Sequence, residues 1–496
     1  GTPAIFGNFS GMADFAIPDA LLLNGTEIPA DYSDKGFGTI GTWWEPSVEH
    51  LATLLLEAND MDATRYRLLS EAGVRAIRAK FSWRECSLSI RRALIEENEG
   101  KFAASTARSK TSANARGVGG TQRTPSPGGA GWQPAGAGVS MRWKGVVVRG
   151  LRRGGFLATF FADRLEQQGW KQALAASSKQ LVAPFFRTRG KWLRQRITGE
   201  GQASDQQAPV LPIRFTSEPL ELRDGVLFIG YAEGALGLGQ AFRANLTAAE
   251  AVDLPFAVYP FRVGIESRLI GEYMPHRYDK KHPYDVNVIE VACDQVPAVF
   301  RELDPRLLAQ SYNILCPYWE LSKAPEAWRG NLAHIHEIWA PNTFIADAFA
   351  HIFDGPITVM PPAMDDTGGD HPGRAHFGMD EKRFYFMFSF DYYSSPFRKN
   401  PLGVLHAFRE AFPLGDANVG LVIKSTGAPD HFPDIKAVIG DAIRQDPRIL
   451  MFDSNMARDE MLGLIRSSDA YVSLHRAEGF GLGMAEAMTF ERIVIG

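Results

Sequence analysis

Short apolar runs alternate with stretches of helical periodicity over the second half of the chain. Such runs are typical of buried strands, and they fall at 226–230, 256–259, 287–291, 337–340, 357–360, 384–389, 420–424, 449–452 and 470–474. Strands that alternate with helices predict parallel sheets covered on both faces. The Pro361-Pro362 pair and the Asp/Gly-rich stretch up to Gly378 predict a hinge, so we expect two α/β domains.

The first half of the chain divides by composition. Residues 1–98 are mixed and have a globular composition, whereas residues 99–140 are rich in Gly, Ala, Ser, Thr and Pro. Such low-complexity sequence buries too little apolar surface to offset its ordering entropy, so we expect a disordered linker there. The predicted parts of the chain are 1–98, a linker region over 99–215, an amino-side domain over 216–365 and a second domain over 366–496.

Residues 141–200 are strongly basic, with aromatic residues interleaved. Three interpretations stay open: a helical connector that docks its aromatics on a neighbouring domain, a basic amphipathic segment on an anionic membrane surface, and a contact to a nucleic-acid backbone. The formal net charge of the whole chain is −4, which gives no general argument for nucleic acid. We therefore expect no nucleic-acid partner, and we carry peripheral membrane contact through 141–200 forward.

The composition gives no sign of a metal site or a disulfide framework. The three cysteines, Cys86, Cys293 and Cys316, lie far apart, which fits a reducing compartment. No apolar run is long enough to span a bilayer. We therefore expect a cytoplasmic protein without metal or other cofactor, either free in solution or peripheral on the inner membrane face.

The segment richest in candidate chemistry is 473–488, Ser-Leu-His-Arg-Ala-Glu-Gly-Phe-Gly-Leu-Gly-Met-Ala-Glu-Ala-Met. A predicted strand ends near Leu474 and a helix begins near Gly481, so the glycines between them leave backbone N–H groups at a positive helix end, which suits a diphosphate. Glu478 on the loop and Glu486 in the first turns of the helix can face one ligand, and carboxylates accept hydrogen bonds from sugar or ribose hydroxyls. Neither feature is specific alone.

A second candidate segment, 390–401, follows the predicted strand at 384–389 and carries Arg398 and Lys399. Loops at the carboxyl edge of an α/β sheet are where such folds bind ligands. A lysine there can neutralise a diphosphate leaving group without a metal. Taken alone, the pair also fits a solvated surface. Lys424, at the end of the next strand, either supplies a second positive charge or is a strand-end surface lysine.

Together these segments resemble glycosyltransferase family four, the retaining group-one enzymes with a Glu-x7-Glu signature and the GT-B fold, in which two Rossmann-like domains face each other across a cleft. The resemblance implies that Glu478 contacts the transferred sugar, Glu486 holds the nucleotide ribose and Lys399 stabilises the diphosphate. Tyr393 stands where the family usually has an arginine. The donor-binding residues implied are Arg398, Lys399, Lys424, Glu478, Gly479, Phe480, Gly481, Leu482 and Glu486.

The amino-side domain shares further runs with that family. Gly237, Leu238 and Gly239 resemble its opening glycine loop and imply an acceptor or phosphate loop, although Gln240 replaces the usual Glu. Two other runs, 318–320 and 339–344, also resemble family motifs.

Glu320 closes the first of these runs, and the resemblance implies that it sits at a strand-to-helix turn facing the cleft. Two interpretations of it stay open. It either orients an acceptor hydroxyl, as a catalytic residue beside Lys399 and Glu478, or caps the next helix.

The two ends of the chain resemble the two sides of one cut in that family. The chain stops at Gly496 directly after a strand-like run, and the family's continuation appears at 9–15 and 43–50, with Met12 in place of the usual Asn. One interpretation is a circular permutant in which 1–98 completes the domain at 380–496. The other is a cut from a tandem array, in which 1–98 ends an upstream copy. We lean to the tandem origin and expect that the pieces still fold together.

The resemblance implies a retaining, metal-independent enzyme that moves a hexose, such as mannose or glucose, from a nucleoside diphosphate sugar to a glycan or lipid-linked acceptor in surface polysaccharide biosynthesis. The nucleotide sugar is a substrate, so no cofactor is expected. Two alternatives stay open: a non-catalytic scaffold that binds sugar nucleotide or glycan, and a GT-B-shaped epimerase, for which the sequence shows no acid/base pair.

Overall fold

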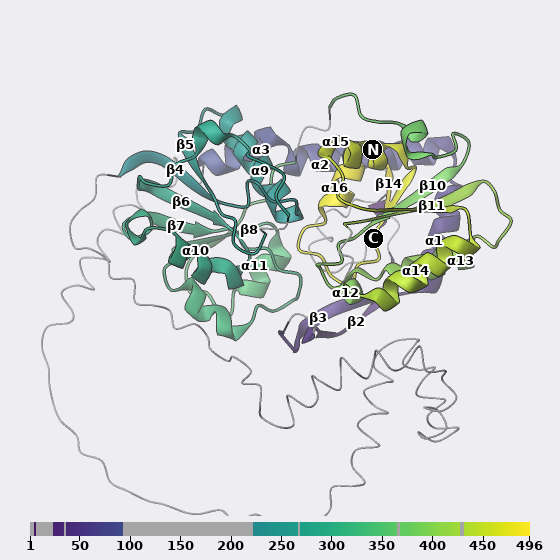
Figure 1. Ribbon diagram of the computed structural model, residues 1–496, viewed down its shortest axis with the longest axis horizontal. Helices are drawn as coiled ribbons and strands as arrows, with labels where there is room; N and C mark the ends of the chain where they lie inside the picture. The colour runs from purple at the N-terminus through teal and green to yellow at the C-terminus, as the bar shows by residue number, and fades with distance from the viewer. Residues whose placement is uncertain are drawn as a thin grey trace, which may run out of the picture. The chain divides into compact units, whose positions relative to one another are not determined.

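The computed structural model describes residues 4–5, 23–33, 36–92, 222–265, 268–364, 368–426 and 431–496. The predicted α/β architecture is confirmed, because these residues form two six-stranded parallel sheets with helices packed on them, beside one small hairpin (Figure 1). The predicted linker at 99–215, the basic segment at 141–200 and Met12 lie outside the described residues. In the part of the chain that is described, no helix is both long and apolar enough to cross a bilayer.

The first sheet is built from residues 223–359 and has the strand order β5-β4-β6-β7-β8-β9. Its strands are β4 (Arg223–Gly230), β5 (Phe256–Pro260), β6 (Tyr284–Glu290), β7 (Tyr312–Leu315), β8 (Glu337–Ala340) and β9 (Ile357–Val359), and its helices are α9 (Gly237–Ala251), α10 (Val296–Glu302) and α11 (Thr343–Phe349). From β4 the chain runs to β5 on one side and then to β6 on the other. The strand order therefore reverses between β4 and β6, which makes this the switch point of the sheet.

The second sheet has the strand order β1-β14-β13-β10-β11-β12. Its strands are β1 (Ala4–Ile5), β10 (Phe384–Ser389), β11 (Val419–Ser425), β12 (Ile449–Asp453), β13 (Ala470–Val472) and β14 (Ile493–Ile495). Its helices are α12 (Pro396–Lys399), α13 (Pro401–Ala411), α14 (Pro433–Gln445), α15 (Arg458–Ser467) and α16 (Leu482–Thr489). The chain runs from β10 outward to β12 and then returns to β13 on the other side, so the loops after β10 and β13 meet at the switch point.

Strand β10 shows why these runs are continuously apolar in sequence. Phe386 and Phe388 belong to one buried cluster, and Tyr385 and Met387, which alternate with them, belong to another. Successive side chains of a strand point to opposite faces of the sheet. A strand covered by helices on both faces must therefore be apolar at every position.

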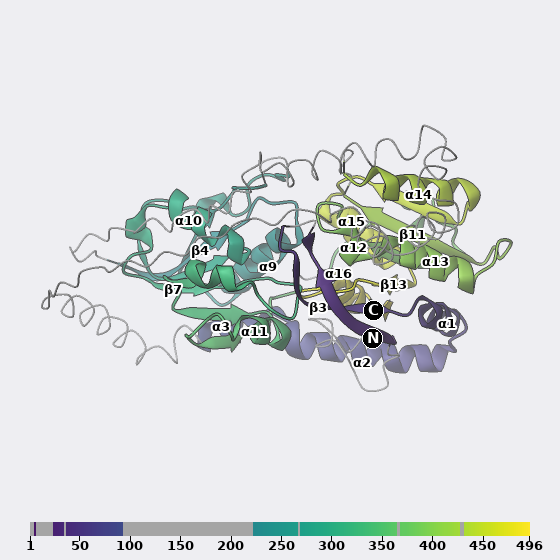
Figure 2. The same cartoon turned by 90° about the horizontal axis from the view of Figure 1, so that it is seen from below.

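The amino-terminal part of the chain packs on both sheets. Strand β1 pairs in parallel with β14, α1 (Val48–Asn59) packs on α13, and α2 (Ala63–Phe81) packs on α16 (Figures 1 and 2). Helix α3 (Trp83–Arg91) instead packs on α9 of the first sheet. In this structure the segment that was predicted either to complete the second domain or to end an upstream copy is thus shared between both halves of the same chain.

A hairpin of β2 (Gly25–Asp31) and β3 (Thr39–Pro46) precedes α1 (Figure 2). Tyr32, after the first strand, lies with its ring 6.1 Å from that of Trp319. At the second strand, the backbone N–H of Trp44 donates to the carbonyl of Arg476 at 2.7 Å, and Glu45 forms a 2.6 Å ion pair with the Arg476 side chain. The hairpin therefore supports the loop after β13, which holds the Glu-x7-Glu segment.

Candidate functional site

Lys399 is held in place by a very short helix after β10. Helix α12 begins at Pro396 and ends at Lys399. Its C-cap residue, Asn400, adopts a left-handed conformation with φ of 52°, and Pro401 then starts α13. Proline suits the first turn of a helix because it has no N–H to lose there. The two prolines fix a single turn that carries Arg398 and Lys399 at the switch point of the second sheet.

Glu478, on the loop after β13, lies in direct contact with this turn. Its Oε1 forms an ion pair with Lys399 Nζ and lies 3.1 Å from Arg398 Nη1 and 2.8 Å from His475 Nδ1. Burial alone would raise the pKa of Glu478, but the cations Lys399 and Arg398 hold that pKa well below its usual range. The two segments that carry the predicted chemistry thus meet, with Glu478 ionised.

Arg398 is buried beneath this contact, with 2% of its surface exposed. Besides Glu478, its guanidinium lies 3.3 Å from Glu320 Oε1 and donates to the carbonyl of Ala477 at 2.7 Å. Arg398 therefore joins Glu320, from the first sheet's side, to Glu478. Its predicted contact with the donor stays a prediction, because in this structure the side chain braces other protein groups.

The structure also separates the two interpretations of Glu320. No helix begins at Glu320; the next helical turn in the chain starts at Glu326, with Pro325 as its N-cap residue. The helix-cap interpretation therefore does not hold. Glu320 instead lies beside Arg398, and its predicted role toward an acceptor hydroxyl stays a prediction.

His475 is a site residue to which the sequence assigned no role. Burial, together with the nearby Lys399, lowers the pKa of His475 to about 4, so its ring is neutral at neutral pH. The ring packs edge-on against Phe388 of β10 at 5.5 Å. His475 precedes Glu478 by three residues, and this spacing was the indication available in the sequence. It brings two side chains together in a helix, but in a loop it does not predict a contact.

The glycine-rich loop leads into α16 as predicted. Gly481 is the N-cap residue of this helix, with φ of 89°, a left-handed conformation that favours glycine. The carbonyl of Gly479 accepts a 2.6 Å hydrogen bond from Asn342 Nδ2, and Phe480 packs on Phe81 of α2. The amides from Gly479 to Leu482 therefore lie at or beside a helix amino terminus, and their contact with a ligand stays a prediction.

Glu486 lies within α16, and 2% of its surface is exposed. Arg458 Nη1, from the start of α15, lies 2.6 Å from Glu486 Oε1. The sequence did not point to Arg458, because nothing in the segment 453–460 marks it as a partner of a residue in another helix.

Lys424 has a different environment from the predicted one. Its Nζ donates to the carbonyls of Ser425 at 2.7 Å and Ser454 at 2.9 Å. Burial lowers the pKa of Lys424 to about 8. It is therefore no surface lysine, and its ammonium holds together the ends of β11 and β12; a contact with diphosphate stays a prediction.

The predicted glycine loop of the first sheet is shorter than expected. Gly237, Leu238 and Gly239, which were expected in a loop, form the first turn of α9. Arg243 closes the turn by donating to the carbonyls of Ala232 and Gly234, both at 3.0 Å.

Gly239 marks the closest approach in this turn. A Cβ at that position would lie 2.4 Å from the carbonyl oxygen of Gly234, so only glycine fits there. The three residues thus lie at a helix amino terminus next to the switch point of the first sheet, and their role toward acceptor or phosphate stays a prediction.

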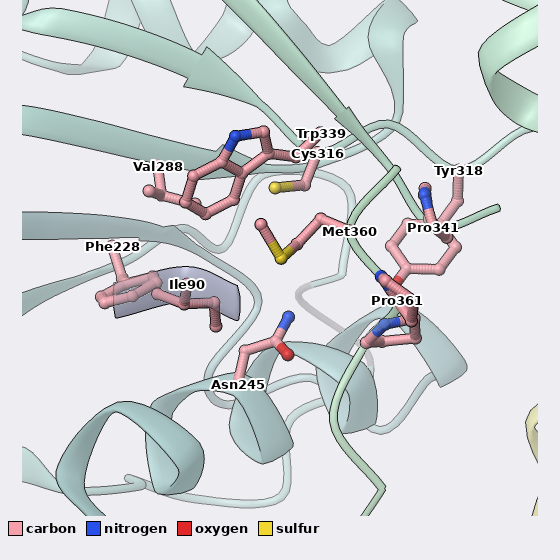
Figure 3. Close-up of a pocket in the computed structure, with 11 residues that line it drawn as sticks. Ile90, Phe228, Asn245, Val288, Cys316, Tyr318, Trp339, Pro341, Met360 and Pro361 are labelled. Carbon is pink, nitrogen blue, oxygen red and sulfur yellow. The ribbon is translucent and has the colours of Figure 1, made fainter. Parts of the chain in front are cut away.

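A buried carboxyl group, Glu290, ends β6 at this switch point. Asn245 Nδ2 donates to its Oε2 at 2.9 Å, and the Tyr318 hydroxyl lies 3.5 Å from its Oε1. Asn245 and Tyr318 also line a mostly apolar cavity of about 20 Å³, together with Cys316 and Met360 (Figure 3). Burial raises the pKa of Glu290 from its ordinary value of 4.5 to about 7.

This pKa predicts a pH-dependent stability. The folded protein keeps the Glu290 proton where the unfolded chain loses it, so stability falls by roughly 3 kcal/mol as pH rises from about 4.5 to about 7, and Glu290→Gln removes this dependence. Urea unfolding of both proteins near pH 5 and near pH 8 measures the difference. The exposed Glu272 offers a matched control, because Glu272→Gln should leave the pH dependence in place. If the unfolding free energy of Glu290→Gln fell with pH as much as that of the wild type, Glu290 would not be the source of the pH dependence.

Among the described residues, no group of three or more His, Cys, Asp or Glu side chains is arranged to hold a metal ion.

No family model matches this chain, and no curated protein matches it. Among solved structures it is similar to OtsA in its apo form, with 10% identity over 42% of this chain and 55% of that one and a TM-score of 0.32. It is also similar to the pneumococcal O-GlcNAc transferase GtfA in complex with UDP and GlcNAc, with 13% identity over 42% of this chain and 41% of that one and a TM-score of 0.31. A third similar structure is Anabaena Alr3699/HepE in complex with UDP-glucose, with 14% identity over 54% of this chain and 79% of that one and a TM-score of 0.37. The chain thus spans about half the length of the first two, and the functional assignment rests on its own residues.

Proposed function

We propose that this chain is a glycosyltransferase that moves a hexose from a nucleoside diphosphate sugar to a glycan or lipid-linked acceptor, with retention of anomeric configuration. One observation carries the proposal. Lys399 and Glu478 come from two segments that were each singled out in the sequence, and they form an ion pair where the loops after β10 and β13 meet. Doubly wound sheets bind nucleotides at this place.

The charges of the cluster fit a diphosphate leaving group. Arg398 and Lys399 form ion pairs with Glu320 and Glu478 in this structure. An entering diphosphate adds negative charge beside Lys399, the member of the two cations with more exposed side-chain surface. In this mechanism Lys399 and the amides at the start of α16 stabilise the charge that develops as the bond to the sugar breaks.

The proton of the acceptor hydroxyl is transferred to the leaving diphosphate in this mechanism. In a transfer with retention on one face of the sugar, the leaving diphosphate oxygen takes the proton of the attacking hydroxyl. Glu320 is suited to orient that hydroxyl, because it lies beside Arg398 at the same cluster. We expect the reaction to proceed unchanged in the presence of EDTA, since positive side chains rather than a metal neutralise the diphosphate.

Two alternative functions use the same groups. A non-catalytic scaffold would bind the nucleotide but release no diphosphate from a sugar donor. An epimerase would need an acid/base pair near the sugar; Glu290 with Tyr318 is such a pair by chemistry, but Glu290 is 1% exposed. Transfer is therefore favoured, with a role in surface polysaccharide synthesis by a cytoplasmic protein as the biological setting that we propose.

The direct test is isothermal titration of UDP and of GDP, without metal, against the whole chain. We expect one of them to bind with micromolar affinity and Glu486→Ala to weaken that binding by about tenfold or more, because a carboxylate that accepts ribose hydroxyls is lost. Glu410→Ala, at an exposed position of α13, serves as the matched control and should bind like the wild type. Binding of neither nucleotide by the wild type would overturn the proposal.

A further inference from the structure

Arg458 contacts the buried carboxyl group of Glu486. Arg458 lies 2.6 Å from this carboxylate, and 31% of the arginine side chain remains exposed, against 3% for the glutamate. Removing a carboxylate from water is costly unless a cation compensates for the lost hydration. Arg458 therefore reaches from the surface inward and gives the buried carboxyl group of Glu486 a cationic partner.

The position of Arg458 is not explained by its own helix. It is the first residue of α15, where the helix dipole is positive and disfavours a cation. The acidic residues Asp459 and Glu460 in the same turn suit this position, and Glu460 Oε2 accepts a 3.1 Å hydrogen bond from the Ala457 N–H. The partner that explains Arg458 is thus Glu486, in a different helix.

The loop that carries Arg458 is fixed at the carboxyl edge of the second sheet. Strand β12 ends at Asp453, and the next carbonyl, that of Ser454, accepts a hydrogen bond from Lys424 at 2.9 Å. Lys424 in turn is one of the last two residues of the neighbouring strand, β11. Arg458 therefore follows β12 at the carboxyl edge of the sheet, where doubly wound sheets bind ligands, and it contacts Glu486 there.

We propose that Arg458 is the positioning residue of the ribose subsite, holding Glu486 ionised and oriented so that it accepts hydrogen bonds from the 2′- and 3′-hydroxyls of a nucleoside diphosphate sugar. This inference rests on the proposed function. An ionised carboxylate forms stronger hydrogen bonds with hydroxyls than a neutral carboxyl does. A carboxylate that already has a fixed partner also loses less freedom when the ribose binds.

The test compares two ligands that differ only at the ribose. For the base that the titration identifies, the nucleoside diphosphate and its 2′,3′-dideoxy analogue are titrated against the wild type, Arg458→Ala and Arg458→Lys. We expect the wild type to prefer the ribonucleotide by about tenfold or more, and Arg458→Ala to bind it about tenfold more weakly while binding the dideoxy analogue as before. Arg458→Lys should recover part of the preference, because it keeps the charge but not the planar fork.

Two further variants separate positioning from general stability. Arg466→Ala, at an exposed position of the same helix, should leave the affinities for both ligands unchanged. In Glu486→Ala the loss of Arg458 should have no additional effect on ribonucleotide binding, because the two residues act through one contact. This comparison remains informative even if Arg458→Ala is less stable.

Each other outcome has a defined meaning. Equal weakening of both ligands in Arg458→Ala would show a structural role only and would overturn the inference. Tighter ribonucleotide binding in that variant would show that Arg458 competes with the ribose, which also overturns it. If the wild type binds neither nucleotide, the proposed function fails first; if it binds them without regard to the ribose hydroxyls, only this inference fails.

Discussion

Replacing Lys399 by alanine is expected to slow cleavage of the sugar donor by about 10²–10³-fold, the usual effect of removing one group that stabilises charge in a transition state. Lys399 pairs with Glu478, has more exposed side-chain surface than Arg398, and lies at the end of a one-turn helix. The measurement is the release of nucleoside diphosphate from UDP-glucose or GDP-mannose, according to which nucleotide binds. Binding of the free nucleotide should weaken far less than the rate.

Lys382→Ala provides the matched control for this experiment. Lys382 is exposed and precedes β10 at its amino end, whereas Lys399 follows the carboxyl end of the same strand. The control should cleave the donor at the wild-type rate. An unchanged rate in Lys399→Ala would remove this lysine from the mechanism, and partial activity in Lys399→Arg would indicate that its charge is what matters.

The second large effect is expected at Arg398, on stability. Arg398→Met should lower the free energy of unfolding by about 3–5 kcal/mol, because it leaves two carboxylates, Glu478 and Glu320, without their shared buried cation. Urea unfolding followed by tryptophan fluorescence gives the difference. Combining Arg398→Met with Glu478→Gln should recover part of the loss, since Glu478 then keeps only Lys399 as a cationic partner and the second change removes its charge.

An exposed ion pair supplies the contrast for Arg398. Arg444 pairs with Asp441 on the surface of α14, where water screens the interaction, so Arg444→Met should leave the unfolding midpoint unchanged. A midpoint for Arg398→Met equal to that of the wild type would contradict the buried network described above.

Most strands of the two sheets could be predicted from sequence because they form continuous apolar runs, whereas β7, with Asn313 inside it, was not among the predicted runs. The run predicted at 384–389 is β10 to the residue, and the run at 470–474 contains β13. Helix starts were predicted less well. The residues 237–239 were expected in a loop but form the first turn of α9, because glycines at the start of a helix resemble a loop in sequence.

The side-chain partners of the site could be predicted only in part. Lys399 and Glu478 carry recognisable sequence signals, and the sheet topology brings their loops together. Arg458 and Glu486 carry no joint signal, because residues on different helices meet through packing, and periodicity within one element says nothing about the other. Arg398 and Glu320 also carry no joint sequence signal, because Arg398 follows a strand of the second sheet and Glu320 follows a strand of the first.

The pairing of β1 with β14 also sets an order of events during synthesis. Ala4 pairs with Val494, so all residues between these two strands must be synthesised before this edge of the sheet can close. Helices α1 and α2 likewise wait for α13 and α16, the helices on which they pack. Closing so long a loop is entropically costly and slow, so the apolar faces of α1 and α2 stay exposed in the nascent chain, and we expect aggregation during synthesis to begin at these two helices.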